Sequence, residues 1–356
     1  MRNIYLKLPE IENAGSGIVL ATVTATVGST PQKPGSSAIF RNGSLITGTV
    51  GGGVVEGKVQ EAAKECSISG KSRLLHLLLK SDISRKEEAI CGGEIDILID
   101  ANPNIHFSVF SNLQKSLEKR EPGVLITMVT QYAEDQVLVN RYWMTAKSKP
   151  HIPPEFLVKI EPEAARILDS ADNENFLRME LSIPGEEPSS VFFLEPVFPM
   201  PRLIIAGAGH IGKALSHLGR MLDFEVTVID DRRDFANSEN LPDAEYVIVK
   251  EIGEAMTSIE KSSDTFIVIV TRGHHDDANA LKPCIGSGAA YVGMIGSKAK
   301  IARMKAEFIE KKWANEEQWK SIHAPVGLDI KSKTVEEIAI SIAAELILIK
   351  NSGGKI

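Results

Sequence analysis

Hydrophobic positions in the first half of the chain form short segments of strand length. β-Branched and apolar residues fill three early segments, 18–27, 37–41 and 44–50. The last two flank Asn42-Gly43, the strongest short signal for a β-hairpin. Apolar residues at helical spacing from Val55 to Cys66 predict a helix. The other elements predicted in this half are strands 73–79, 91–100, 124–131, 137–145, 176–183 and 191–195, and helices 107–119 and 156–169.

From residue 202 onward, short apolar strands alternate with helical segments. The predicted strands are 203–206, 226–229, 245–250, 266–270 and 291–295. This order predicts a parallel doubly wound sheet with right-handed crossovers, whereas the hairpins and helices of the first half predict an α+β domain. Thr334 and Glu337 form a capping box ahead of an apolar stripe that runs to Ile349, so the last helix is predicted there.

Prolines divide the two halves. Pro196, Pro199 and Pro201 punctuate a short, stiff connection, which predicts domains at 1–198 and 199–356. The overall prediction is therefore an α/β protein in which an α+β domain is followed by a Rossmann-type sheet.

Composition and charge narrow the class of protein. A net charge of −7 over 356 residues argues against a nucleic-acid partner, because phosphate binding relies on clustered Lys and Arg. Three scattered cysteines fit a reducing cytoplasm and neither a disulfide framework nor a zinc site. The N-terminus lacks a signal-peptide pattern. The longest apolar run, 338–349, is interrupted by Ser341 and Glu345 and is too short for a membrane span, so we expect a cytoplasmic protein without a membrane partner.

Three glycines after the strand at 203–206 have the spacing of a dinucleotide-binding turn. They are Gly207, Gly209 and Gly212, and a helix follows them. In this pattern the first glycine permits a tight turn, the second lets backbone approach a pyrophosphate, and the third lets helix and strand pack closely. Asp230, at the end of the next strand, stands where a carboxylate that binds ribose is expected.

A second glycine turn leads into a helix in the first half. Gly51, Gly52 and Gly53 are consecutive, and successive glycines let backbone amides converge on an anion at a helix N-terminus. A sharp turn that needs positive φ is the alternative. Glu56 lies in the first helical turn, where complementing the helix dipole is its simplest role.

The cysteines differ in their setting. Cys91 precedes Gly92 and Gly93 in a loop, where a soft ligand can reach its thiol. Cys66 and Cys284 lie in apolar helical segments and are predicted to be core residues.

Histidines and aspartates follow the strand at 266–270, at the edge where a doubly wound sheet binds its ligand. The run His274-His275-Asp276-Asp277 offers side chains that bind metals or move protons, but adjacent residues rarely ligate one ion without help, so no metal site is assigned. His210 either joins this run across the crevice or caps backbone carbonyls at the surface. No serine lies in a Gly-x-Ser-x-Gly elbow, and the Walker A pattern is absent.

Six parts of the chain resemble the XdhC/CoxI family, accessory proteins of molybdenum hydroxylases such as xanthine dehydrogenase. In family order they are Gly28–Pro31 with Pro34–Gly35, Gly51–Gly57, Cys91–Asp96, Gly207–Gly212, Tyr291–Ser297, and His323–Asp329 with Glu336–Ser341.

The resemblance implies an XdhC/CoxI domain followed by a Rossmann domain. It also implies a homodimer that binds the molybdenum cofactor (molybdopterin), protects it during sulfuration and delivers it to an apo molybdenum hydroxylase, with a cysteine desulfurase as a further candidate partner. The candidate cofactor-binding residues are Gly51, Gly52, Gly53, Glu56, Cys91, Gly92, Gly93, Gly207, Gly209, His210, Gly212 and Asp230.

Two positions depart from the family pattern. Val54 stands where the family commonly has a cysteine implicated in holding the cofactor, and Gln32 stands where an arginine is common. The glycine loop keeps backbone amides for the pterin phosphate but loses a thiolate and one phosphate partner. Cys91 is then the remaining candidate thiol.

Three functional hypotheses fit these observations. The leading one is a cofactor-insertion chaperone without catalysis of its own. The second is an NAD(P)-dependent oxidoreductase in which Asp230 binds ribose and His210 or His274 moves a proton. The third is a regulatory module that senses a nucleotide.

Overall fold

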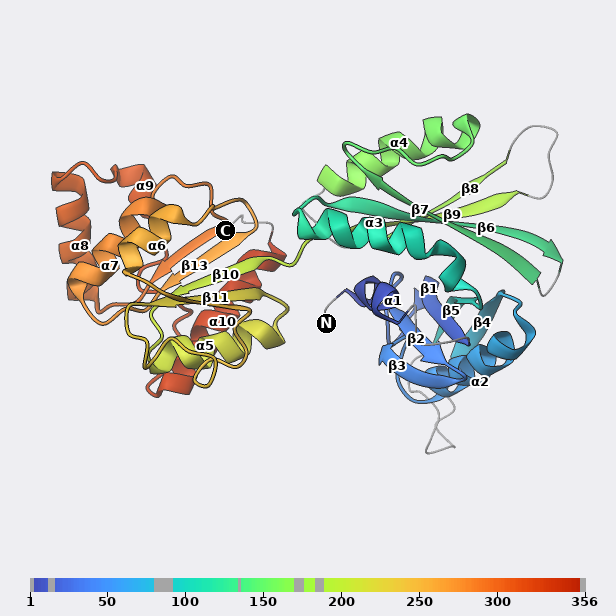
Figure 1. Ribbon diagram of the computed structural model, residues 1–356, viewed down its shortest axis with the longest axis horizontal. Helices are drawn as coiled ribbons and strands as arrows, with labels where there is room; N and C mark the ends of the chain where they lie inside the picture. Colours follow the sequence, from blue (N-terminus) through green and yellow to red (C-terminus); the bar gives the residue numbers. More distant parts are fainter. Residues whose placement is uncertain are drawn as a thin grey trace. The chain divides into compact units, whose positions relative to one another are not determined.

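The computed structural model describes residues 3–11, 17–79, 92–133, 136–169, 176–182 and 189–352. The chain divides into two compact units, Met1–Pro199 and Met200–Ile356 (Figure 1). Each unit has its own hydrophobic cores, so each can be described by itself.

The amino-terminal unit begins with an antiparallel sheet of order β3-β2-β1-β5-β4. Its strands are β1 (Ile18–Gly28), β2 (Ser37–Arg41), β3 (Ser44–Gly48), β4 (Arg73–Leu79) and β5 (Gly93–Asp100). Helix α2 (Val54–Ser69) covers one face, and the apolar residues that predicted this helix, from Val55 to Cys66, are the ones buried against the sheet.

A second antiparallel sheet of the same unit has the order β7-β6-β9-β8. Its strands are β6 (Gly123–Ala133), β7 (Gln136–Thr145), β8 (Leu177–Leu181) and β9 (Ser190–Val197). Helix α4 (Pro154–Asp169) packs on one face of this sheet through Phe156, Ile160, Ala164 and Ile167. The helix was predicted at 156–169.

Short helices fill the space between the two sheets. They are η1 (Ile4–Leu6), α1 (Lys7–Glu10), η3 (Pro103–His106) and α3 (Phe107–Glu118). Tyr5 and Phe110 stack between them, with ring centroids 5.8 Å apart. A buried ion pair between Asp100 of β5 and Arg141 of β7 adds a polar link between the sheets. Together these contacts fix the layers of the unit.

The carboxyl-terminal unit is built on a parallel sheet of order β12-β11-β10-β13-β14, which confirms the predicted doubly wound topology. Its strands are β10 (Arg202–Ala206), β11 (Glu225–Asp230), β12 (Tyr246–Val249), β13 (Thr265–Ile269) and β14 (Tyr291–Met294). Because β10 lies between β11 and β13, the turn after β10 stands where the strand order reverses, the usual ligand edge of such sheets.

Helices cover both faces of this parallel sheet (Figure 1). On one face lie α5 (His210–Met221) and α10 (Val335–Asn351). On the other lie α6 (Ile252–Ser258), α7 (His274–Leu281), η4 (Lys282–Cys284), α8 (Lys298–Glu310) and α9 (Glu316–Lys320). The predicted capping box of the last helix is formed, since Thr334 and Glu337 exchange their side-chain and backbone hydrogen bonds.

The polar residues that interrupt the apolar run of α10 hold the loop that precedes it. Glu345 is buried and accepts hydrogen bonds from the Tyr291 hydroxyl, from Nδ1 of His323 at 3.0 Å and from the Gly327 amide at 2.7 Å. Ser341 donates to the Leu328 carbonyl at 2.6 Å. Both side chains are therefore part of the fold.

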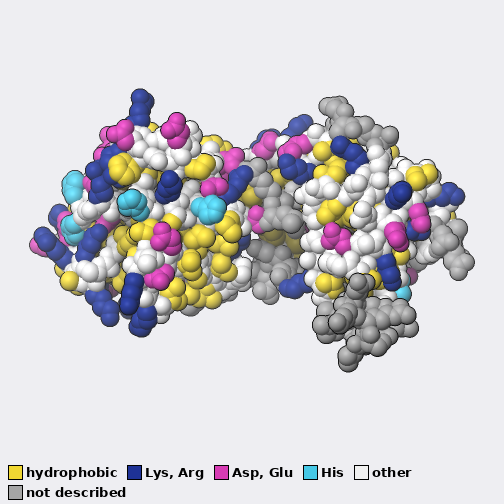
Figure 2. Space-filling model, turned by 90° about the horizontal axis from the view of Figure 1, so that it is seen from below, with side chains coloured by type: hydrophobic (Ala, Val, Ile, Leu, Met, Phe, Trp, Pro, Cys, Tyr) yellow, Lys and Arg dark blue, Asp and Glu magenta, His cyan; other side chains and the backbone are white. Residues whose placement is uncertain are grey.

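The surface mixes charges of both signs. Figure 2 shows Lys and Arg side chains scattered among Asp and Glu on the face that it presents. Among the described residues, none of the helices combines the length and apolarity that a membrane crossing requires.

Candidate functional site

The three glycines of the turn in the carboxyl-terminal unit have different surroundings. Gly207 has φ +117°, and a Cβ there would lie 2.5 Å from the Val270 carbonyl oxygen. A Cβ on Gly212 would lie 1.9 Å from the Gly207 carbonyl oxygen, so helix and turn pack backbone to backbone. Gly209 has nothing within 4 Å of its Cβ position. It is the point of the turn that a ligand can approach.

Asp230 serves the turn itself. Its carboxylate accepts the Ala208 amide at 2.8 Å, the Arg232 amide at 3.0 Å and the Arg232 guanidinium at 2.8 and 2.9 Å. Burial alone would raise the pKa of Asp230, but the combined effect of these donors is larger and lowers the pKa to about 2. Its two oxygens, which the glycine-turn pattern assigned to ribose, are engaged within the protein.

Other charged groups at this edge also pair with one another. Arg272, after β13, contacts both carboxylate oxygens of Asp231 at 3.0 and 3.2 Å. Asp277 is buried, forms an ion pair with Lys300 and accepts the Thr271 hydroxyl. The first pair links the segments that follow β11 and β13, and the second links α7 to α8.

The run from His274 to Asp277 forms the first turn of α7, and its side chains point to separate partners. His274 contacts Glu307 of α8 at 2.8 Å, and His275 contacts Asn279 at 3.2 Å. In the part of the chain that the structure describes, no three His, Cys, Asp or Glu side chains converge as metal ligands would. The side chains of this run therefore contact separate partners and do not form one site.

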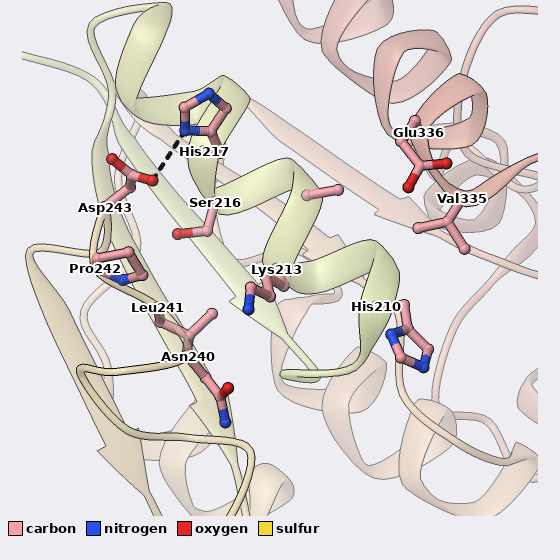
Figure 3. A pocket seen from close by; sticks show the side chains of 11 residues that line it. His210, Lys213, Ser216, His217, Asn240, Leu241, Pro242, Asp243, Val335 and Glu336 are labelled. Carbon is pink, nitrogen blue, oxygen red and sulfur yellow. Dashed lines mark hydrogen bonds and ion pairs between the residues drawn. The ribbon is translucent and has the colours of Figure 1, made fainter.

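A groove of about 400 Å³ runs beside the first turns of α5 (Figure 3). His210 and Lys213 of α5 line it together with Leu241, Val335 and Glu336. At its far end His217 and Asp243 contact each other at 2.9 Å. His210 is exposed here, so it faces this groove from the start of the helix.

Three glycine-containing segments that are far apart in sequence meet in the amino-terminal unit. Gly28 pairs with Gly93 across β1 and β5, and a Cβ on Gly93 would lie 2.5 Å from the Ser29 carbonyl oxygen. A Cβ on Gly51 would lie 2.9 Å from Pro31. The loop 28–36 therefore packs against both the Gly92-Gly93 segment and the Gly51–Gly53 loop, as only glycines allow at these distances.

The Gly51–Gly53 loop presents open backbone at the start of α2. Neither Gly52 nor Gly53 has an atom within 4 Å of its Cβ position, and Gly53, at the helix N-cap, has φ +59°. No side chain caps α2, so its first-turn amides face this open loop. Glu56 lies in that turn and is half-buried, as is Val54. The arrangement suits an anion that approaches the backbone closely.

Neither cysteine of the described residues belongs to the Gly51–Gly53 loop. Cys66 and Cys284 are buried, as predicted, and burial raises the pKa of the Cys66 thiol and raises that of Cys284 to about 12. Cys91, the remaining candidate thiol, lies outside the described residues. Gln32, at the position where the family pattern has arginine, accepts a hydrogen bond from Ser36 at 3.0 Å and stiffens its own loop.

Sequence reasoning missed two acidic residues with structural partners far away in the chain. Glu195 of β9 accepts the Tyr5 hydroxyl at 2.6 Å, 190 residues apart. Glu345 accepts hydrogen bonds from Tyr291, His323 and Gly327. The only signal for either was a single acid inside an apolar segment, which does not say what the acid contacts.

Each of the two units matches a known protein family. Residues 12–77 match the XdhC and CoxI family, and residues 203–346 match the XdhC Rossmann domain. The uncharacterized protein YqeB of Escherichia coli (strain K12) is 23% identical over 98% of this chain, which spans about half the length of YqeB (47%). A relative from Bacillus subtilis (strain 168), named as a probable subunit of xanthine dehydrogenase, is 23% identical, covering 98% of this chain and 97% of the relative.

A solved structure shares the fold over both units. It is described as a xanthine dehydrogenase from Bacillus halodurans and matches with a TM-score of 0.73 at 23% identity, over 97% of this chain and 95% of that one. The two family matches lie in separate units and follow the order of the glycine turns described above. The chain belongs to the XdhC and CoxI family.

Proposed function

We propose that the protein binds the molybdenum cofactor and hands it to an apo molybdenum hydroxylase of the xanthine dehydrogenase type. The observation that carries the proposal is the packing of loop 28–36 against both the Gly92-Gly93 segment and the open Gly51–Gly53 loop, which leads into the uncapped start of α2. The name of the B. subtilis relative, which refers to xanthine dehydrogenase, supports the choice of client.

The described residues fit the phosphate of the cofactor. Open space at Gly52 and Gly53 lets a phosphate reach the amides of α2, and the positive end of the helix dipole favours its charge. Bound cofactor would supply redox chemistry only after transfer to the client, so this chain's part is to hold it. A thiolate contact has no donor at Val54. We propose that Cys91 supplies it.

Cofactor loading tests the proposal directly. The full chain, expressed in cells that make molybdopterin and purified without oxygen, should carry a pterin that is released and detected by fluorescence after oxidation. Gly52→Asp should lower the bound pterin at least tenfold, because a carboxylate repels the phosphate that the helix dipole attracts. Gly273→Asp is a matched control: it places the same charge at an open glycine that precedes α7 in the other unit.

Two results would reject the chaperone. One is a purified protein without pterin, and the other is unchanged hydroxylase activity in cells that lack the gene. The same preparations test the further parts of the proposal: a homodimer by light scattering, and a cysteine desulfurase by co-purification from the cytoplasm.

A nucleotide is a second candidate ligand, in the carboxyl-terminal unit. Gly209 leaves the turn open at the start of α5, which favours it. NAD(P) oxidoreduction with Asp230 on the ribose would have to displace Arg232 and the Ala208 amide from that carboxylate. Calorimetry with ADP, NAD and NADP separates the alternatives: heat from ADP alone supports a nucleotide-sensing unit, whereas tighter nicotinamide binding that Asp230→Ala weakens supports the oxidoreductase.

A further inference from the structure

A second concave surface of the amino-terminal unit is centred on Glu195, near the end of β9. It is an open groove of about 440 Å³. The other residues that line it are Lys33, Pro34, Gly35, Ser36, Phe176 and Pro196. A volume of this size accommodates a small heterocyclic ligand.

Hydrogen bonds hold the Glu195 carboxyl group in one orientation. Its Oε2 accepts the Tyr5 hydroxyl at 2.6 Å, and that hydroxyl lies 3.4 Å from Oγ of Ser37. Ser37 in turn contacts Thr22 Oγ1 at 3.0 Å and the Gly35 carbonyl at 3.2 Å. Oε1 receives none of the hydrogen bonds found among the described residues and lies on the side of Gly35. One oxygen is therefore anchored, and the other is directed toward the groove.

The carboxyl group forms no ion pair among the described residues. The cation that acts on it is Arg141, whose guanidinium is already paired with buried Asp100. Burial raises the pKa of Glu195 to about 7, against the smaller opposing effects of Tyr5 and Arg141. A desolvated acid without an ion-pair partner costs stability, and such groups gather at ligand sites.

We propose that Glu195 recognises the aminopyrimidinone edge of a pterin, in which a ring N–H and an amino group point the same way. Oε1 accepts one donor of the pair from the groove, and Oε2 accepts the other beside the Tyr5 hydroxyl, because each carboxylate oxygen has two lone pairs. The Phe176 ring and the flat faces of Pro34 and Pro196 supply apolar walls for the rings. Gly35 has φ +91°, and a Cβ there would come within 3.3 Å of the Phe176 ring, so this glycine keeps the wall close.

This inference rests on the proposed function, because it names the part of the cofactor that the groove would bind. The same loop serves both sites: Pro31 packs against Gly51 of the phosphate cradle, and Lys33 to Ser36 wall the groove. Lys33 adds a cationic side chain to the rim.

Free heterocycles test the groove without the intact cofactor. Calorimetry on the full chain would compare pterin, lumazine (which replaces the amino group by a carbonyl) and guanosine, which carries the same edge on a purine. We expect pterin to bind at least tenfold tighter than lumazine, the lower end for a charge-assisted hydrogen bond. Equal affinities, or no binding of either pteridine, would overturn the proposal. Guanosine binding tighter than pterin would assign the site to purines and overturn it for pterin.

Glu195→Gln supplies the second arm, with Glu163→Gln as the matched control, because Glu163 pairs with Arg166 on α4, away from the residues that line the groove. The variant should lose at least tenfold in pterin affinity and its preference over lumazine, while the control keeps both. The comparison of pterin with lumazine on the unchanged protein decides the question if the variant does not fold. Intact cofactor that co-purifies equally well with Glu195→Gln would overturn this inference and leave the proposed function standing. A preference for pterin over lumazine without any co-purified cofactor would support this inference and reject the proposed function.

Discussion

The two glycine turns of this protein look alike in sequence and differ in what their glycines do. In the carboxyl-terminal unit, neighbouring backbone occupies the space where Gly207 and Gly212 would carry a Cβ, and only Gly209 of the three has open space there. In the amino-terminal unit Gly52 and Gly53 are both open. A glycine spacing therefore predicts a strand-to-helix turn well, but the atoms around each glycine decide whether it serves packing or a ligand.

Charge separates the turns further. The turn before α5 has its own carboxylate, because Asp230 accepts the Ala208 amide and is balanced by Arg232. The start of α2 has no side-chain cap. No side chain caps α5 either, so both helices leave first-turn amides open, and the turns differ in the Ala208 amide, which Asp230 satisfies, and in their open glycines. Substitutions at matched glycines sharpen this contrast.

The largest effect is expected at Gly212. In Gly212→Ala the new methyl group would lie 1.9 Å from the Gly207 carbonyl oxygen, and neither backbone segment can move away without separating α5 from β10. We expect the free energy of unfolding to fall by about 3 kcal/mol, the upper range for overpacking. Denaturant unfolding of the full chain measures it. A loss below about 1 kcal/mol would mean that this helix and turn are not closely packed.

The second effect concerns Asp230 and depends on pH. Its pKa is lowered in the folded protein from an ordinary 3.8 to about 2, so its stabilisation is complete above pH 4 and is lost as pH falls through 2. The shift corresponds to about 2 kcal/mol. Asp230→Asn should therefore be less stable by about that amount at pH 6, with the difference closing toward pH 2.

Asp243→Asn provides the control for that experiment, since this half-buried acid pairs with an exposed histidine on the flank of α5. Its effect on stability should be small. An Asp230→Asn difference that stays constant from pH 6 to 2 would show that the carboxylate is not the source of the acid sensitivity.

Periodicity and glycine spacing predicted the strands, α2, α10 and both turns because these depend on neighbours in sequence. The roles of Asp230 and Glu195 depend on groups brought together by folding: the Ala208 amide lies 22 residues from its partner, and Tyr5 lies 190 residues from Glu195. The pairing of His274 with Glu307 is of the same kind, since Glu307 belongs to a helix 33 residues away. Local patterns carry no information about such partners.

A smaller effect is expected at Gly53, whose conformation rather than its surroundings resists a side chain. Its φ of +59° with ψ −124° is a region that L-residues rarely adopt, but nothing lies near its Cβ position. Gly53→Ala should cost about 1.5 kcal/mol of backbone strain. Thermal unfolding measures this cost. An unchanged midpoint temperature would show that the loop tolerates a side chain at this position.

The smallest effect on stability, and the most informative one, is expected at the open glycine without positive φ in each of the two turns. Gly52→Ala and Gly209→Ala each place a methyl group in open space, so each should change the free energy of unfolding by no more than about 0.5 kcal/mol. Their effects on ligands should differ. Gly52→Ala should reduce the bound pterin, because the methyl group holds a phosphate away from the α2 amides, whereas Gly209→Ala should leave pterin loading unchanged and weaken only a nucleotide at α5. If Gly209→Ala were the variant that lost the pterin, the cofactor phosphate would belong to the carboxyl-terminal turn, and the open loop at α2 would need another ligand.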